Sequence, residues 1–162
     1  MNGKIRIGYS RDTHILVEGR DLFLGGIKIP FEKGLLGHSD ADVLLHAIAE
    51  AILGALALGD LGTHFPDNDP KYKGIDSKIL LKEVVQMMKN KGYKIGNVDT
   101  MLILELPKMK PHILEIRESI AGLLETSVDN ISVKATTNEK MGYLGENKAI
   151  ETNAVVLLES GE

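Results

Sequence analysis

The sequence predicts an α+β fold in which helices pack on one face of a mixed β-sheet. Three segments carry apolar residues at helical spacing, and segments with strand-like alternation precede, separate and follow them. The 162 residues, of which 43% are hydrophobic, are enough to bury one sizeable core, and no repeat or linker-like tract divides them. We therefore expect a single domain over residues 1–162.

The first third of the chain is predicted to be rich in β-structure. Lys4–Ser10 has the composition of a short strand. Leu22–Pro30 is interrupted by Gly25-Gly26, which predicts a hairpin with its turn at the two glycines.

A first helix is predicted to follow Ser39. Ser39 and Asp42, three residues apart, resemble a capping box with Asp in place of Glu. The apolar residues beyond them share one helical face, which we expect to be buried: Leu45, Ile48, Ile52 and Leu56.

A second helix is predicted to begin at Asp76 or Ser77 and to end at Gly92, with two lysines in its last turn. Tyr93–Leu104 follows it as a predicted strand. The inward-facing residues of this helix are expected to be Leu80, Leu81, Val84 and Met88.

The last third of the chain is predicted to contain a third helix and two strands. Pro107 and Pro111 suit the approach and first turn of the helix, and Ile131–Ala135 is the next predicted strand. The helical spacing runs through Ile113, Ile116, Ile120 and Leu124, whereas Ile150, Ala154, Val156 and Leu158 lie two or four apart, as in a half-buried strand.

The composition excludes several classes of protein. The formal charge of −4 and the pI near 5.7 argue against a broad nucleic-acid surface, which depends on clustered Lys and Arg. No stretch reaches the roughly 18 apolar residues of a spanning helix and no signal-peptide pattern is present, so we expect a cytoplasmic protein with no membrane partner. Because there is no cysteine, a metal would have to be held by His, Asp or Glu.

Asp12, His14 and His46 are the candidate metal ligands. Asp12 and His14 are two residues apart, so in an extended segment both side chains project to the same side and can bind one ion. His46 lies in an otherwise apolar helical segment and could supply a third ligand. Three such ligands leave the open position typical of catalytic zinc. From the residues alone, polar side chains at a strand end and an ordinary helical histidine remain the alternative.

His38-Ser39-Asp40 is a candidate phosphate site. It precedes the predicted first helix, whose N-terminal N–H groups could bind a phosphate with His38 as a further donor. Simple helix capping is the alternative, although capping does not require the histidine.

Two further segments could bind a ligand. Asp60-Leu61-Gly62 and Phe65–Pro70 form a turn-rich connection that is longer than two helices require, and a solvated acidic loop is its alternative interpretation. Lys134–Glu139 leaves a predicted strand with two threonines and a carboxylate close together. Glu139 could hold a magnesium ion through oxygen.

Taken in order, these segments resemble the 2-C-methyl-D-erythritol 2,4-cyclodiphosphate synthase family. The resemblance covers roughly residues 6–158, and so many motifs in the same order are highly specific. The matching segments are Asp12-Thr13-His14, Gly25-Gly26 with Ile29-Pro30, His38–Asp42, His46, Asp60–Gly62, Phe65–Asp69, Gly92-Tyr93 with Gly96–Asp99, Pro107–Met109 and Lys134–Lys140.

The resemblance implies a metal-dependent phosphorus–oxygen lyase of isoprenoid-precursor biosynthesis. Its substrate would be 4-diphosphocytidyl-2-C-methyl-D-erythritol 2-phosphate, whose 2-phosphate attacks the β-phosphate and releases CMP. It also implies a homotrimer with active sites between adjacent subunits.

The resemblance carries roles for particular residues. Asp12, His14 and His46 would bind zinc, and Glu139 would bind magnesium or manganese bridging the diphosphate. His38 and Thr137 match positions of transition-state stabilisation. The implied substrate-binding residues are Asp12, His14, His38, Ser39, Asp60, Leu61, Gly62, Phe65, Pro66, Asp67, Asn68, Asp69, Leu104, Lys108, Met109, Lys110, Thr136, Thr137, Asn138, Glu139 and Tyr143.

Several residues depart from the family pattern. Glu146 stands where many members have arginine, Asn153 replaces a frequent glutamate, and Arg11 replaces an aromatic residue. An acidic Glu146 would repel an isoprenoid diphosphate from a cavity on the trimer axis. Asn138 replaces a more usual threonine, but Thr136, Thr137 and Glu139 are retained. Two other functional classes remain as alternatives: a zinc phosphohydrolase, which would give an acyclic product, and a noncatalytic protein of the same fold.

Overall fold

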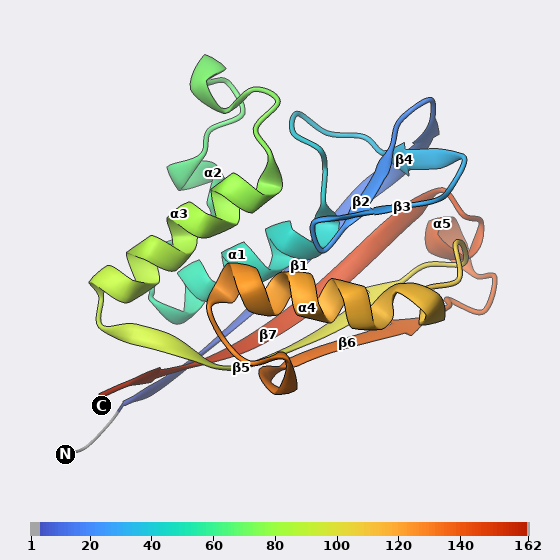
Figure 1. Cartoon of the computed structure of the whole chain (residues 1–162). Helices are drawn as coiled ribbons and strands as arrows, with labels where there is room; N and C mark the ends of the chain where they lie inside the picture. Colours follow the sequence, from blue (N-terminus) through green and yellow to red (C-terminus); the bar gives the residue numbers. More distant parts are fainter. Residues whose placement is uncertain (1–3, 162) are drawn as a thin grey trace.

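The computed structural model describes residues 4–161 and contains a five-stranded sheet in the order β4-β1-β7-β5-β6, with a separate hairpin of β2 and β3. β5 and β6 are parallel and the other neighbouring strands are antiparallel, so the sheet is mixed. Figure 1 shows α1, α3 and α4 together on one side of it, which confirms the predicted α+β fold. The elements are β1 (Ile5–Glu18), β2 (Leu22–Leu24), β3 (Ile27–Ile29), β4 (Lys33–Leu35), α1 (Val43–Ala55), α2 (Leu61–His64), α3 (Ser77–Asn90), β5 (Tyr93–Ile103), α4 (Ile113–Leu124), β6 (Ile131–Thr136), α5 (Gly142–Gly145) and β7 (Ala149–Ser160), with 3-10 turns at Pro70–Tyr72, Lys110–His112 and Val128–Asn130.

β1 is longer than the predicted strand Lys4–Ser10, and this positions the candidate metal ligands. Gly8 and Ser10 are buried on the side of the sheet that faces α1. Because side chains alternate along a strand, Asp12 and His14 lie on that same side. The two residues therefore lie within β1 and point toward the helices, rather than at a strand end.

α1 lies at the centre of the core. The predicted apolar face is confirmed, since Leu45, Ile48 and Ile52 are fully buried and Leu56 is 8% exposed. α1 contacts β1, β7 and α3, so nearly every side of the helix is covered. None of the helices in residues 4–161 is long and apolar enough to span a membrane.

The predicted capping box at Ser39 is wrong about which residue caps the helix. Asp42 is the N-cap of α1, and its fully buried carboxylate accepts hydrogen bonds from the N–H groups of Leu45 (3.0 Å), Gly25 (3.0 Å) and Gly26 (2.7 Å). The Ser39 hydroxyl instead accepts from Ala41 N–H. One carboxylate thus holds the turn of the β2–β3 hairpin against the start of α1.

The other predicted boundaries agree closely with the structure. Asp76 caps α3, and Gly92 ends the turn that follows it with a positive φ of 82°, a conformation that glycine adopts without strain. α4 begins at Ile113, immediately after the 3-10 turn that contains Pro111. The predicted strands in the second half of the chain correspond to β5, β6 and β7.

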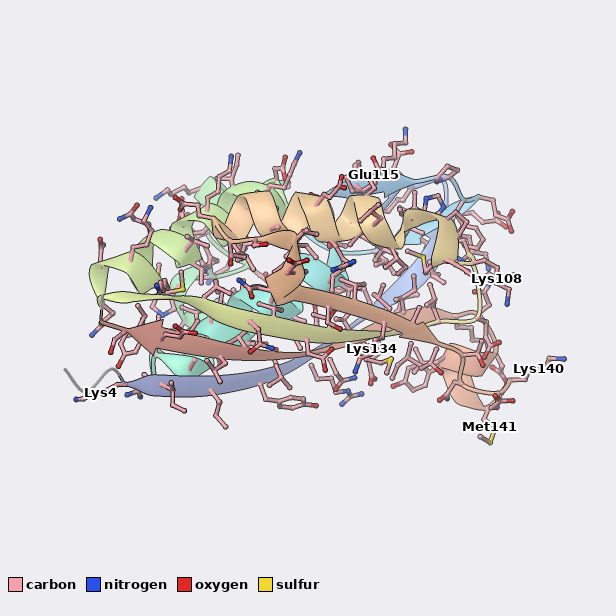
Figure 2. All side chains as sticks on the ribbon, turned by 60° about the horizontal axis from the view of Figure 1, so that its bottom comes forward. Lys4, Lys108, Glu115, Lys134, Lys140 and Met141 are labelled. Atoms are coloured by element: carbon pink, nitrogen blue, oxygen red, sulfur yellow. The ribbon has the colours of Figure 1, made fainter. Side chains whose placement is uncertain are left out.

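The face of the sheet opposite the helices carries exposed apolar side chains. Figure 2 shows the long helices on one side of the sheet, with the short α5 beside Met141 at one end. Large exposed apolar patches are uncommon on monomeric soluble proteins. The exposed apolar residues of this face on β1 and β7 are Ile5, Ile7, Tyr9, Ile15 and Val155.

Candidate metal site and adjoining cavities

Asp12, His14 and His46 meet between β1 and α1. Asp12 Oδ2 lies 3.0 Å from His14 Nε2 and 3.4 Å from His46 Nδ1. One donor atom from each residue lies within 4.8 Å of the others, and these three form the one such group in the part of the chain that the structure describes. The three-residue group predicted from the sequence is thus confirmed as a possible metal site.

The alignment of β1 with α1 brings the three residues together. The strand passes the helix in the opposite direction, so that the backbone of Gly8 lies against Ala51 and the Ser10 hydroxyl donates to Glu50 Oε2 at 3.0 Å. Two residues further along β1, Asp12 reaches His46, one helical turn before Glu50. Asp12 and His46, which are 34 residues apart in the sequence, come into contact through this packing.

The hydrogen bonding of His14 suits a metal ligand. Its Nδ1 lies 2.9 Å from the carbonyl oxygen of Leu36. A carbonyl oxygen can only accept, so Nδ1 carries a proton, and in the neutral imidazole Nε2 then has a free lone pair beside Asp12. Metal-bound histidines are commonly oriented in this way by a backbone carbonyl. One carboxylate and two imidazoles match the ligand chemistry of catalytic zinc.

The same contacts shift the pKa values of Asp12 and His14. Burial alone would raise the pKa of Asp12, but hydrogen bonds from His14 and His46 outweigh it and pull the pKa well below its ordinary value. Burial lowers the pKa of His14, but the hydrogen bond and negative charge of Asp12 outweigh it and raise the pKa. Both shifts have one physical cause, the close contact between the Asp12 carboxylate and the imidazoles.

We expect metal affinity to fall steeply on the acid side of neutrality. A proton and a metal compete for His14 Nε2, so affinity is lost as pH falls through the raised pKa of His14, beginning above the ordinary histidine value of about 6.5. Each proton displaced changes the affinity by up to about tenfold per pH unit. Chelator competition between pH 8 and pH 4 measures this, and a flat profile would contradict histidine ligation.

The metal group opens into a cavity of about 290 Å³. His38, which lines this cavity, is exposed, and Ser39 is half-buried. At the adjoining helix terminus, the Asp42 carboxylate accepts from the N–H group of Leu45. The predicted site residues that line this cavity are Asp12, His14, His38, Ser39, His46, Leu61, Gly62, Phe65 and Asp67.

A second cavity, of about 330 Å³, lies where β5 and β6 end. Figure 2 shows Lys108 at the same end of the molecule as Lys140 and Met141, with Lys4 at the opposite end. The predicted site residues that line this second cavity are Leu104, Lys108, Met109, Lys110, Thr136 and Thr137.

The remaining predicted residues line neither cavity. Asp60 caps α2, its Oδ1 accepting from Thr63 N–H at 3.0 Å. Tyr143 lines a third cavity, of about 410 Å³, which also touches His14. Glu139 is exposed, has a positive φ of 51° and is not part of the three-residue metal group. The others in this set are Pro66, Asn68, Asp69 and Asn138.

Three acidic or hydroxylic residues at the site were missed from the sequence. Glu50 lines the metal cavity and accepts from Leu61 N–H at 3.1 Å; its position four residues after His46 was an available signal. Glu105 Oε1 accepts from the N–H groups of Asn138 (2.9 Å) and Lys140 (3.2 Å), on either side of Glu139. Ser77 contacts His46, and nothing in its local sequence marks it.

Comparisons with known proteins identify the family. The family model described as the YgbB family matches residues 5–159. The chain belongs to the YgbB family. A curated relative from Chloroherpeton thalassium, named 2-C-methyl-D-erythritol 2,4-cyclodiphosphate synthase, is 61% identical over 155 residues, which cover 96% of this chain and 99% of the relative. The resemblance drawn from the sequence motifs is thereby confirmed.

Solved structures agree with this YgbB-family assignment. The bifunctional IspDF from Campylobacter jejuni superimposes with a TM-score of 0.95 at 36% identity; the match covers 99% of this chain but 44% of that protein, so this chain spans less than half of it. A CDP complex of IspF from Plasmodium falciparum superimposes with a TM-score of 0.87 at 39% identity and covers all of both chains.

Proposed function

We propose that this YgbB-family chain is a 2-C-methyl-D-erythritol 2,4-cyclodiphosphate synthase that acts on 4-diphosphocytidyl-2-C-methyl-D-erythritol 2-phosphate. The observation that carries the proposal is the convergence of Asp12, His14 and His46 beside the His38-Ser39 cavity, in a chain 61% identical to a relative of that name. The Plasmodium structure described as a CDP complex supports a cytidine nucleotide as ligand.

The proposed reaction is an intramolecular phosphoryl transfer. An oxygen of the 2-phosphate forms a bond to the β-phosphorus, and the bond from that phosphorus to the bridging oxygen breaks, so that CMP leaves with the electron pair. Such a transfer needs positioning and charge neutralisation rather than a side-chain nucleophile. This classes the enzyme as a phosphorus–oxygen lyase.

Asp12, His14 and His46 are the proposed zinc ligands. When bound there, zinc supplies Lewis-acid polarisation of a phosphate oxygen. His38 lines the same cavity and is assigned the donation of a hydrogen bond to the phosphate charge that develops, with Ser39 positioning the methylerythritol portion.

Glu139 and Thr137 are proposed to act on the diphosphate. Glu139 would hold magnesium or manganese through a hard oxygen ligand, and Thr137 would provide a hydroxyl to the transition state. The loop that bears them is held by Glu105 through the N–H groups of Asn138 and Lys140, and Thr137 Oγ1 accepts from Glu139 N–H at 3.3 Å. These bonds support a defined position for an otherwise exposed carboxylate.

A homotrimer with active sites between subunits completes the proposal. Within one chain, the metal cavity and the Lys108–Lys110 cavity have no lining residue in common. A neighbouring subunit would bring its own Lys108–Lys110 cavity to the metal group as the nucleotide side of the pocket. The exposed apolar face of the sheet, which includes Ile7 and Tyr9, supports close association of copies.

We do not propose that an isoprenoid diphosphate binds on the trimer axis. Arg11, on the outer face of the sheet, is paired with Glu151 at 2.9 Å. Glu146 is paired with Lys148 at 2.7 Å, so neither charge pair leaves a free cation for an anionic ligand.

Phosphorus NMR of the protein with zinc, magnesium and the proposed substrate tests the function. We expect the cyclic diphosphate and CMP to appear together. Inorganic phosphate or an acyclic product would instead indicate the zinc phosphohydrolase, in which metal-activated water attacks phosphorus. No turnover by folded, zinc-loaded protein would indicate a noncatalytic relative.

A further inference from the structure

Behind the metal group, His46 is connected to two residues with no assigned role. Its Nε2 lies 2.8 Å from the hydroxyl of Ser77, the first residue of α3. That hydroxyl in turn contacts Asp40 Oδ1. Ser77 is fully buried and the His46 side chain is 13% exposed, so water does not readily replace these contacts.

The direction of each hydrogen bond follows from Asp40. Its Oδ2 accepts from Ser77 N–H at 3.1 Å and its Oδ1 from Asp42 N–H at 3.2 Å. Backbone N–H groups can only donate, so both carboxylate oxygens are acceptors. The Ser77 hydroxyl therefore donates its one proton to Asp40 and has only lone pairs to offer His46.

A hydroxyl that can only accept determines the tautomer of His46. Nε2 must carry the proton to satisfy Ser77, and in a neutral imidazole the other nitrogen then has a free lone pair. That nitrogen, Nδ1, is the one that faces Asp12 Oδ2 at 3.4 Å. The Ser39 hydroxyl is a second neighbour of Nε2, but at 3.3 Å it is more distant than the Ser77 hydroxyl at 2.8 Å.

We infer that Asp40 and Ser77 are positioning residues that hold His46 in its metal-binding tautomer and orientation. His14 obtains the same control from a backbone carbonyl, whereas His46 lies on a helix whose carbonyls are used internally and requires side chains. The inference rests on the proposed metal site. The same contacts join the loop 36–42 to the start of α3. Gly74, just before α3, adds a further bond between these segments, since its N–H donates to the His38 carbonyl at 2.8 Å.

The hydrogen bonds from His46 through Ser77 to Asp40 form a relay, which can be tested by measuring zinc affinity. The measurement uses chelator competition on the full-length protein. Ser77→Ala removes the acceptor and is expected to weaken zinc binding about 10- to 100-fold, the usual effect of losing a hydrogen-bond partner of a metal ligand. Ser77→Thr keeps the hydroxyl and should retain most of the affinity. Ser119→Ala is the matched control, since it removes a helical hydroxyl that donates to Gly25 O at 2.7 Å, away from the metal site, and should leave affinity unchanged.

Asp40→Asn separates the relay from a purely structural role. The amide has the same shape, and its oxygen can keep the bond from Ser77 N–H. Its NH₂ group then takes the place of Oδ1, where it loses the bond from Asp42 N–H but can donate to the Ser77 hydroxyl. The hydroxyl can then donate to His46 Nε2, which moves the histidine proton to Nδ1. We expect a loss of zinc affinity similar to that of Ser77→Ala and a changed visible spectrum of the cobalt-substituted protein, with circular dichroism unchanged.

The outcomes distinguish this inference from the proposed function. Parental zinc affinity in both Asp40→Asn and Ser77→Ala would overturn the relay, whatever the NMR assay of cyclisation gives. Weaker zinc binding in Ser77→Ala, together with near-parental zinc affinity in Ser77→Thr, supports the relay. This holds even if the zinc-loaded parent does not cyclise the substrate. If Ser77→Ala fails to fold, the comparison of Asp40→Asn with Ser77→Thr gives the same decision.

Discussion

Replacing His46 by alanine is expected to abolish both zinc retention and cyclisation while leaving the fold intact. The change removes one of the three side chains, Asp12, His14 and His46, that form the candidate metal site. Lewis-acid stabilisation of a phosphoryl-transfer transition state is worth several kcal/mol, so turnover should fall on the order of 10³-fold or more. The site should also lose zinc during gel filtration, as measured by metal analysis of the purified protein.

The fold should survive because His46 is not part of the apolar core of α1. Its side chain faces the metal cavity and keeps partial exposure, whereas Leu45 and Ile48 on the same helix are fully buried. His112→Ala is the matched control for zinc stoichiometry, since His112 lies outside the metal group in the turn before α4. Full zinc occupancy in His46→Ala would refute the ligand assignment.

The metal group could be predicted from the sequence because its signals are local. Asp12 and His14 needed the strand period of two, and His46 was conspicuous as a polar residue in an apolar helix. What the sequence could not supply was the distance between them. That distance depends on how β1 packs against α1, which is a property of the tertiary structure.

The cap of α1 shows where local pattern fails. Ser39 and Asp42 both satisfy the composition of an N-cap, and their spacing favoured the serine. Tertiary contacts decide otherwise, because the carboxylate of Asp42 can also bind the N–H groups of Gly25 and Gly26 from a distant hairpin. A residue with three partners available outcompetes one with a single partner.

The outer partners of the ligands were also beyond sequence analysis. Ser77 is an ordinary residue in the first turn of a helix until its proximity to His46 is known. Glu105 follows a predicted strand without any motif, yet it holds the backbone on both sides of Glu139. Such residues act through contacts between distant segments, so their spacing along the chain does not reveal them.

Gly8→Ala is expected to destabilise the protein by roughly 3 kcal/mol or more, at the upper end of overpacking effects. A Cβ at Gly8 would lie 1.9 Å from the backbone oxygen of Ala51 and 2.7 Å from the backbone nitrogen of Ala55. Neither atom belongs to a flexible side chain, so β1 and α1 would have to separate. Urea denaturation measures the free energy of unfolding, and a loss below about 1 kcal/mol would contradict this account.

Gly54→Ala is the matched control for this change. Gly54 is an exposed position of α1, and the nearest atom to an added Cβ, the backbone oxygen of Tyr9, is 3.9 Å away. Gly54 lies in the last turn of α1, and replacing a helical glycine by alanine should stabilise the protein by up to about 0.5–1 kcal/mol. The two alanines therefore shift stability in opposite directions. Because β1 carries Asp12 and α1 carries His46, Gly8→Ala should also weaken zinc binding, whereas Gly54→Ala should not.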